Sequence, residues 1–479
     1  MKKQNKTTKG LIWKMGENVG TQGMQFIIQM VLARMLLPAD FGVIGILNVF
    51  TNLANTLVNN GLSSALLRQK EYNAKAYATV FTVSLAISVA GYGLLFAAAP
   101  AIAAFYENMA LTQYLRVYTL TVLVTSISAN CNTILRSRME FRGISLGNLL
   151  GVLGQGICGV TMALNGFGVW SLVWAHVVRY LIPAVVLTIV AKWRPRLYFS
   201  WKILKELFSY SWKLAVGWLI GTLYNDMFSL IVGKRFDSTT LGYYSKGRSI
   251  PSMVNRVLTQ TITSVMFPSL AKDQNDLTVI KARTRTMLAV SAALVLPVMA
   301  GIAACAPAMV SVLLTDVWLP AVPVIQIACI PKAINVINNA NMQSINAIGR
   351  SDVFLYSEAI KRTITVILVL ITSKIDFYLM MWSIAFMGLI SMTVNLVADN
   401  KLLKYTTKEY LQDLLPYVAV ALVLFAAVYS MNWLQINMYV KLVLQLAACA
   451  GIYFSAIFLS PLRAYRHAKK IALNLLRRK

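Results

Sequence analysis

Charged and amide side chains interrupt the first long apolar stretch of the chain, which runs from Gly10 to Gly42. The spacing of these side chains, three or four residues apart, places them on one face of a predicted helix. They are Lys14, Asn18, Thr21, Gln25 and Gln29. A charge near the centre of a bilayer costs at least ~2.5–3.5 kcal/mol, so this face must meet protein or water. Glu17, one turn from Lys14, can pair with that lysine or bind H⁺ or Na⁺.

Similar polar faces recur on later apolar stretches. The stretch near 41–66 has one such face, formed by Asn48, Asn52, Asn55 and Asn59. The stretch near 207–233 has another, formed by Lys213, Gly217, Gly221 and Asn225, with Asp226 adjacent. Ser245, Arg248, Ser252, Asn255 or Arg256, and Thr259 share one near 240–268. Each amide alone is explained by hydrogen bonding between helices, worth about 0.6 kcal/mol. Lysines and arginines at membrane depth instead favour the wall of a hydrated cavity.

The chemistry of that predicted cavity suits an anionic ligand, because Lys and Arg form charge-assisted hydrogen bonds with phosphate and carboxylate groups. The candidate binding residues are Lys14, Lys213, Arg248, Arg256, Asn52, Asn55, Asn225 and Asn255. The acidic exceptions, Glu17 and Asp226, are interpreted as ion-pair partners of nearby bases or as sites for a coupling ion.

The elements that must position these residues are transmembrane helices. Of the 479 residues, 58% are hydrophobic and only 13% are charged, against about 25% charged in soluble domains. Runs of about 20 apolar residues can each span the hydrocarbon layer. Fourteen candidate spans lie near 11–37, 41–66, 76–103, 111–135, 144–164, 168–191, 207–233, 240–268, 286–314, 320–348, 353–373, 377–398, 412–431 and 438–460. The sequence therefore predicts an all-α, multi-pass membrane protein.

The distribution of basic residues predicts the orientation. Lys and Arg together number 45, against 17 Asp and Glu, for a net charge of +28. If both termini are cytoplasmic, the outer loops hold only Lys234, Arg235 and Lys374, as the positive-inside rule requires. The charge is thus explained by topology, with anionic lipid as a secondary partner, and nucleic acid is not an expected partner. We infer no removable signal peptide from MKKQNKTTKG.

An internal repeat divides the predicted helices. At an offset of 200 residues, VLARMLLPADFG at 31–42 aligns with IVGKRFDSTTLG at 231–242, so that Gly42 meets Gly242 and Arg34 meets Lys234. An even number of helices separates the copies, which indicates a parallel repeat of two six-helix lobes around a central cavity. The predicted boundaries are 1–200 for the first lobe, 201–405 for the second, and 406–479 for two further helices and a basic tail.

The residues offer no catalytic or metal site. The two histidines are His176, inside an apolar stretch where we expect a hydrogen-bonded core residue, and His467 in the basic tail. The five cysteines lie in apolar stretches without metal-ligand spacing and are expected to be core residues. No motif of a hydrolase, a P-loop enzyme or a zinc protease is present. We therefore predict neither an enzyme nor a cofactor.

Several segments resemble one family. They are similar to the polysaccharide transporter family of bacterial flippases. The segments are WKMGENVGTQG at 13–23, LARMLLPADFGVIGI at 32–46, NGLSSALLRQKE at 60–71, RSRMEFR at 136–142 and GKRFDSTTLGYYSKGRSIPSM at 233–253. This family belongs to the superfamily of lipid II flippases and multidrug-and-toxin exporters. The resemblance covers at least the first 270 residues of this chain, and beyond them it rests on the number and spacing of the predicted helices.

The resemblance implies two six-helix lobes with alternating access, in the bacterial cytoplasmic membrane. It implies translocation of undecaprenyl-diphosphate-linked repeat units for O-antigen, capsule or exopolysaccharide. The positively charged residues that meet the anionic substrate in such cavities would here be Lys14, Lys213, Arg248 and Arg256. The last two helices would form a groove for the lipid tail. Other polysaccharide-assembly proteins would be further partners. Two alternatives stay open: a multidrug exporter of the same superfamily, and a membrane polysaccharide polymerase.

Overall fold

Helices make up the secondary structure of the described part of the chain. The computed structural model describes residues 20–59, 61–68, 73–271, 276–348, 351–459, 462 and 465. Ten stretches within them are long and apolar enough to cross a membrane. The other four predicted spans, near 11–37, 111–135, 240–268 and 353–373, also contain helix in their described residues. The all-α membrane class is confirmed, and the count of fourteen spans stays a prediction.

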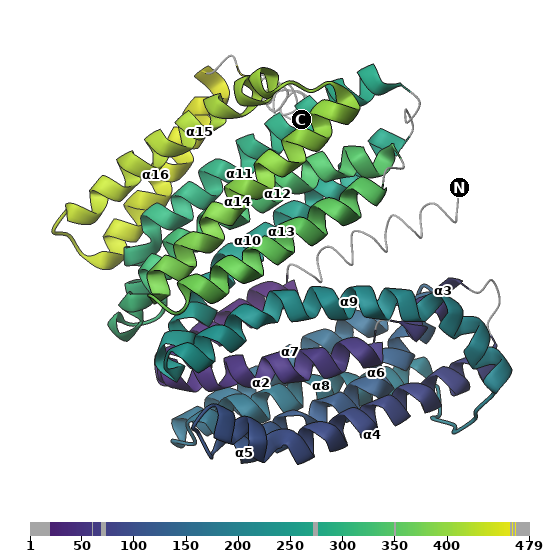
Figure 1. Cartoon of the computed structure of the whole chain (residues 1–479). Helices are drawn as coiled ribbons and strands as arrows, with labels where there is room; N and C mark the ends of the chain where they lie inside the picture. Colours follow the sequence, from purple (N-terminus) through teal and green to yellow (C-terminus); the bar gives the residue numbers. More distant parts are fainter. Residues whose placement is uncertain are drawn as a thin grey trace, which may run out of the picture. The chain divides into compact units, whose positions relative to one another are not determined.

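The chain forms two compact units, Met1–Gly242 and Tyr243–Lys479. Unit 1 holds a helix over 20–35, then α2 (Pro38–Asn59), α3 (Leu62–Arg68), α4 (Ala74–Phe105), α5 (Leu111–Tyr118), α6 (Leu120–Ser137), α7 (Phe141–Leu164), α8 (Val169–Ala191) and α9 (Trp201–Arg235). The helix α10 (Ser238–Ala271) begins in unit 1 and continues in unit 2. Because α9 packs along α2 (Figure 1), the first unit extends past residue 200. The lobe boundaries derived from the repeat stay a prediction.

Unit 2 contains the remaining helices. They are α11 (Leu277–Leu313), the short 3₁₀ helix η1 (Asp316–Ala321), α12 (Val322–Ala347), α13 (Ser351–Thr372), α14 (Phe377–Leu403), α15 (Thr407–Ser430), η2 (Met431–Trp433) and α16 (Met438–Leu459). The long helix α11 packs against α12, α15 and α16, and α14 packs against α12 and α13. Tyr405, Tyr410 and Tyr465 are fully buried in the core that α11, α14 and α15 share.

Polar residues at helix starts fix where these helices begin. Asn73, Asp276 and Asp376 accept hydrogen bonds from the first backbone N–H groups of α4, α11 and α14. Thr406 and Glu409 form a capping box at the start of α15. Such side chains satisfy N–H groups that have no partner inside the helix, which stabilises a helix start by about 1 kcal/mol.

The helix breaks follow the 200-residue repeat. The first described helix stops at residue 35 and α2 begins at Pro38, while α9 stops at Arg235 and α10 begins at Ser238. A Cβ atom on Gly42 would overlap the carbonyl oxygen of Ser238, and one on Gly242 would overlap that of Pro38. The two halves of this contact are equivalent at the predicted offset, and both need a residue without a side chain.

Glycines also hold α7 and α8 together within unit 1. Gly143, Gly147 and Gly151 recur every four residues and face α8. A Cβ atom on Gly151 would lie 2.7 Å from Cγ of Pro183 and 2.9 Å from the carbonyl oxygen of Arg179. Small residues at this spacing let two membrane helices approach closely. The seam brings the polar residues of α8 into the interior of unit 1.

Candidate functional site

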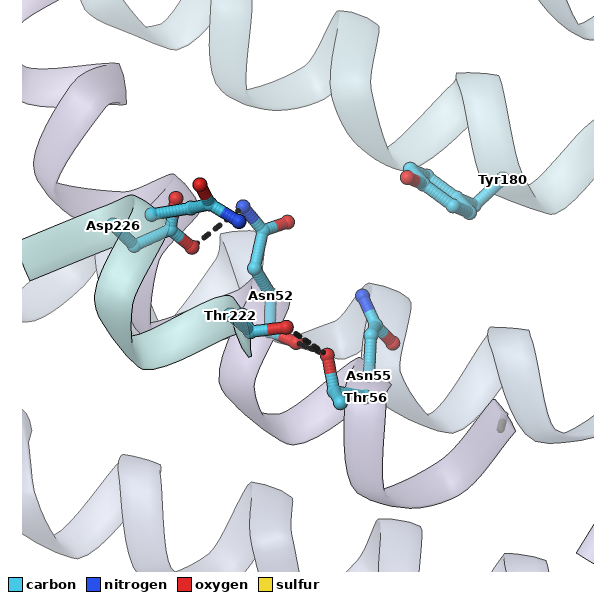
Figure 2. A pocket seen from close by; sticks show the side chains of 7 residues that line it. Asn52, Asn55, Thr56, Tyr180, Thr222 and Asp226 are labelled. Atoms are coloured by element: carbon cyan, nitrogen blue, oxygen red, sulfur yellow. Dashed lines mark hydrogen bonds between the residues drawn. The ribbon is translucent and has the colours of Figure 1, made fainter. Parts of the chain in front are cut away.

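A polar cavity lies inside unit 1, where α2, α8 and α9 meet. Its volume is about 380 Å³, which falls in the range of small-ligand sites. Seven side chains line it: Asn52, Asn55, Thr56, Tyr180, Thr222, Asn225 and Asp226. Figure 2 shows Asn52, Asn55 and Thr56 on α2, Thr222 and Asp226 on α9, and Tyr180 on α8.

Two hydrogen bonds between side chains join α2 to α9 at this cavity. Nδ2 of Asn52 donates to Oδ2 of Asp226 across 3.2 Å, and the hydroxyls of Thr56 and Thr222 lie 3.1 Å apart (Figure 2). Each helix contributes residues four positions apart, so both bonds lie on the helix faces that meet. The polar stripe of α2 therefore serves as a contact with α9 and as part of the cavity lining.

A second layer of hydrogen bonds stands behind the lining. The hydroxyl of Thr125 on α6 donates to Oδ1 of Asn55 across 2.7 Å. Next to it, the hydroxyl of Tyr118 on α5 donates to Oδ1 of Asn48 and lies 2.9 Å from Nδ1 of His176. The rings of Tyr118 and His176 are stacked, with centroids 3.8 Å apart. The expectation of a hydrogen-bonded core histidine is confirmed.

The lining offers hydrogen-bond donors and acceptors, one aromatic face and one carboxylate. Asparagine amides and threonine hydroxyls can both donate and accept. This is the set of groups that can bind a hydroxyl-rich ligand such as a sugar, with Tyr180 presenting an apolar ring and a polar tip. Asp226 brings a negative charge, and it has a further interaction besides the bond from Asn52.

The structure brings together four of the predicted site residues: Asn52, Asn55, Asn225 and Asp226. Asn52 and Asn225 are exposed, and Nδ2 of Asn225 donates to the carbonyl oxygen of Gly221 across 2.9 Å. The predicted residues Lys14 and Glu17 lie outside the described residues. Their proposed pairing stays a prediction.

The predicted cationic residues do not line this cavity as far as the structure describes it. Lys213 is exposed on α9, on the same face as Gly217 and Gly221, whose Cβ positions have no heavy atom within 4 Å. The predicted polar stripe of α9 is therefore open. Lys213 lies near the start of the span Ser211–Arg235, where a lysine can extend its amine to the membrane surface.

The other predicted residues lie in unit 2. Nη1 of Arg248 donates to the hydroxyl of Tyr244 across 2.7 Å, so this guanidinium has a partner within its own helix. Nδ2 of Asn255 donates to the carbonyl oxygen of Lys332 on α12 across 2.7 Å, and Arg256 is exposed. These observations fit a hydrogen-bonding role for Asn255 and leave Arg256 accessible.

Sequence reasoning missed the contribution of α8. Tyr180 lines the cavity, and Arg179 reaches the carbonyl oxygen of Asn148 and Oε1 of Gln25 at 3.4 and 3.5 Å. A signal was present, because His176, Arg179 and Tyr180 are spaced by three and four residues in an otherwise apolar helix. Thr56 and Thr222 carried no such signal, since threonine is common in membrane helices.

The chain belongs to the family described as "Polysaccharide biosynthesis protein", whose profile matches residues 31–323. It is 24% identical over 361 residues to the succinoglycan biosynthesis transport protein ExoT of Rhizobium meliloti (strain 1021), covering 75% of this chain and 72% of ExoT. It is 21% identical over 359 residues to the lipopolysaccharide biosynthesis protein WzxC of Escherichia coli (strain K12), covering 74% of this chain and 72% of WzxC.

A solved structure shares the fold. The lipid II flippase MurJ, in an inward closed conformation, matches with a TM-score of 0.77 at 14% identity, covering 93% of this chain and 98% of MurJ. At that identity the likeness shows the fold alone. Together with the apolar helices, these relatives identify a multi-pass membrane protein related to polysaccharide transport proteins.

Proposed function

We propose that this protein flips undecaprenyl-diphosphate-linked oligosaccharide repeat units across the bacterial cytoplasmic membrane by alternating access. The observation that carries the proposal is the family match over residues 31–323, which includes every residue of the polar cavity in unit 1. Relatives named for succinoglycan transport and lipopolysaccharide biosynthesis support a polysaccharide substrate. The fold shared with a lipid II flippase supports a lipid-linked one. Both termini would be cytoplasmic.

The cavity of unit 1 would bind the sugar part of the substrate. Amide, hydroxyl and aromatic groups line it, and these hydrogen-bond and stack against sugar rings. The exposed cations Lys213 and Arg256, with Lys14, would attract the diphosphate. Asp226 is held by Asn52 and would orient that amide toward the substrate. No chemical step is needed for this function, because the substrate crosses the membrane unchanged.

The test is the leaflet on which lipid-linked repeat units reside after the gene is deleted. Spheroplasts of the deletion strain are treated with a membrane-impermeant sugar oxidant, and the labelled fraction is compared before and after lysis. We expect the units to become reactive only after lysis, and complementation with the unaltered gene to restore surface labelling. Normal surface labelling in the deletion strain would overturn the proposal.

A multidrug exporter is the second candidate, and one observation favours it. Asp226 is the charged side chain among the described residues that line the cavity of unit 1, and a carboxylate attracts cationic drugs. A panel of cationic dyes and drugs distinguishes the two functions. If this protein exports drugs, then the deletion strain becomes sensitive to them. A flippase of repeat units predicts unchanged sensitivity together with loss of the polymer.

A further inference from the structure

One carboxyl group inside unit 2 has no partner that would hold a negative charge among the residues that the structure describes. Asp399 lies in the last turn of α14, and the residue is 0% exposed. Neither of its carboxyl oxygens has a hydrogen-bond partner among the residues that the structure describes. Burying an unpaired carboxylate is so costly that such groups take up a proton instead. A buried carboxyl group whose charged form is disfavoured by its surroundings is a candidate functional site.

The position of Asp399 in its helix disfavours the anion further. α14 ends at Leu403, and Lys404 follows in the left-handed conformation with φ of 53°. The C-terminal turn of a helix carries the negative end of its dipole, which repels an anion placed there. Lys401 and Lys404 are exposed to solvent and so lie away from the buried carboxyl group.

The polar groups near Asp399 include hydrogen-bond donors on α12, α14 and α15. Tyr410 on α15 is buried, and it lies close to Asn341 of α12 and to Asp399. The amide groups of Asn341 and the Nδ2 atom of Asn395, one turn earlier on α14, also lack partners in the described structure. Metal cations need converging oxygen ligands, whereas N–H and O–H donors suit a carboxyl group that exchanges a proton.

Charged groups on the helices packed against α14 are already neutralised. On α13, Lys361 forms an ion pair with Glu358 at 2.5 Å. Nζ of Lys361 also donates to Oδ1 of Asn395 across 3.1 Å. Lys361 is therefore hydrogen-bonded to Asn395 and has no direct bond to Asp399 in the described structure.

Charged groups on α11 and α15 also form ion pairs, and the lysine of α12 lies away from Asn341. Between α11 and α15, Arg285 binds Asp413 and Glu409, and Lys281 binds Glu409. On α12, Lys332 lies more than two helical turns from Asn341 along the sequence. Among the residues that the structure describes, Asp399 therefore has no partner that would compensate its charge if it were ionised.

We propose that Asp399 is a proton-binding site, neutral in the conformation described here, and that it releases its proton when the ends of α12, α14 and α15 separate and admit water. The inference rests on the proposed function in one respect: this exchange would couple translocation of the substrate to the proton gradient. The residue is 0% exposed, so only a change in helix packing can connect its carboxyl group to solvent.

Infrared spectroscopy of the purified full-length protein tests the site without any substrate. We expect the carbonyl stretch of a protonated buried carboxyl group near neutral pH, lost in Asp399→Asn and kept in the control Asp376→Asn. Asp376 caps α14 and is exposed to solvent, and asparagine caps as well as aspartate does. Absence of the band in the unaltered protein would overturn the proposal. So would its disappearance when NaCl is added at constant pH, because that result identifies a sodium site.

A cell-based measurement tests the coupling. An ionophore that collapses the proton gradient should lower polymer export at least tenfold in cells with the unaltered protein. Cells with Asp399→Asn should export little with or without the ionophore, at a normal protein level. Export that ignores the gradient would overturn the coupling while the infrared band still supports the site. Normal surface labelling in the deletion strain would instead overturn the proposed function and leave the infrared result intact.

Discussion

Gly42 lies directly against the backbone carbonyl of Ser238, so closely that a Cβ atom at position 42 would overlap the oxygen. Gly242 stands in the same relation to Pro38, and the two contacts are equivalent at the 200-residue offset of the repeat. Backbone cannot move aside as the end of a flexible side chain can. These two contacts therefore define positions at which the helix pairs accept only glycine.

We predict that Gly42→Ala and Gly242→Ala each destabilise the protein by about 1–3 kcal/mol, the usual cost of overpacking. The measurement is the melting temperature of the detergent-solubilised protein. Gly217→Ala is the matched control, because a Cβ atom there meets no heavy atom within 4 Å. Alanine is also the better helix former by about 1 kcal/mol, so this control should melt at the same temperature or higher. Equal losses at positions 42 and 217 would contradict the prediction.

The carboxylate of Asp226 gives a prediction for the cavity. Asp226→Asn keeps an oxygen that can accept the hydrogen bond from Asn52, which spans 3.2 Å, and removes only the charge. We expect polymer export to fall about tenfold or more, equivalent to ~1.4 kcal/mol, with an unchanged protein level. Asp237→Asn is the control, since Asp237 lies outside the cavity and accepts from the backbone N–H of Thr240. Full export by Asp226→Asn would show that the charge is not needed.

The ion pairs of Arg285 give a prediction for stability. Nη2 of Arg285 donates to Asp413 across 3.0 Å and Nη1 to Glu409 across 2.9 Å. The side chains of Arg285 and Asp413 are only 21% and 10% exposed. Removing one member of a largely buried pair leaves the other charge without a partner, which costs about 3–5 kcal/mol when burial is complete. We expect Arg285→Met to cost about 2–3 kcal/mol after allowance for this partial exposure.

The control for Arg285 is a surface pair. Lys234 and Glu107 lie 3.0 Å apart, with side chains 37% and 83% exposed, and such pairs contribute about 0–1 kcal/mol. Lys234→Met should therefore change the melting temperature little. The double variant Arg285→Met with Asp413→Leu should recover much of the loss, because it removes both charges. A loss in the double variant as large as in Arg285→Met would argue against an ion-pair mechanism.

Acid should weaken the start of α11. The hydroxyl and backbone N–H of Thr278 and the backbone N–H of Val279 donate to Asp276 and hold the pKa of its carboxyl group below the usual range. A lowered pKa in the folded state means that the contribution is present above about pH 3.9, the usual value for aspartate. It is lost as the pH falls through the lower folded value. Hydrogen exchange of the first turn of α11 measures it. Asp276→Asn, a cap without charge, should remove the acid dependence.

Part of the molecule could be predicted because it depends on local pattern. Apolar runs of about 20 residues located the helices, and the repeat located equivalent breaks after residues 35 and 235. Asn52, Asn55, Asn225 and Asp226 were placed together because stripes of polar residues on membrane helices must face protein or water.

The rest depends on which helices pack together, and the sequence does not contain that information in a readable form. Tyr180 lines the cavity from α8, which packs closely against the glycines of α7. Since α8 is far from α2 in the sequence, their contact has no local signal. Asp399 was missed for a different reason. The predicted span ended at residue 398, where a charged residue normally reaches the membrane surface, whereas α14 continues to Leu403 and is covered there by α15.

The reciprocal contacts of Pro38 with Gly242 and of Ser238 with Gly42 also bear on ancestry. In a two-fold dimer interface, residue A of the first copy contacts residue B of the second, and residue B of the first contacts residue A of the second. The contacts of Pro38 with Gly242 and of Ser238 with Gly42 follow this pattern. In an ancestor built from two identical chains, a single glycine would have supplied both contacts at once. Within a single chain the two positions can differ, and here one copy has Pro38 where the other has Ser238. Both copies have a glycine at the contact, and each glycine faces the backbone of the opposite copy.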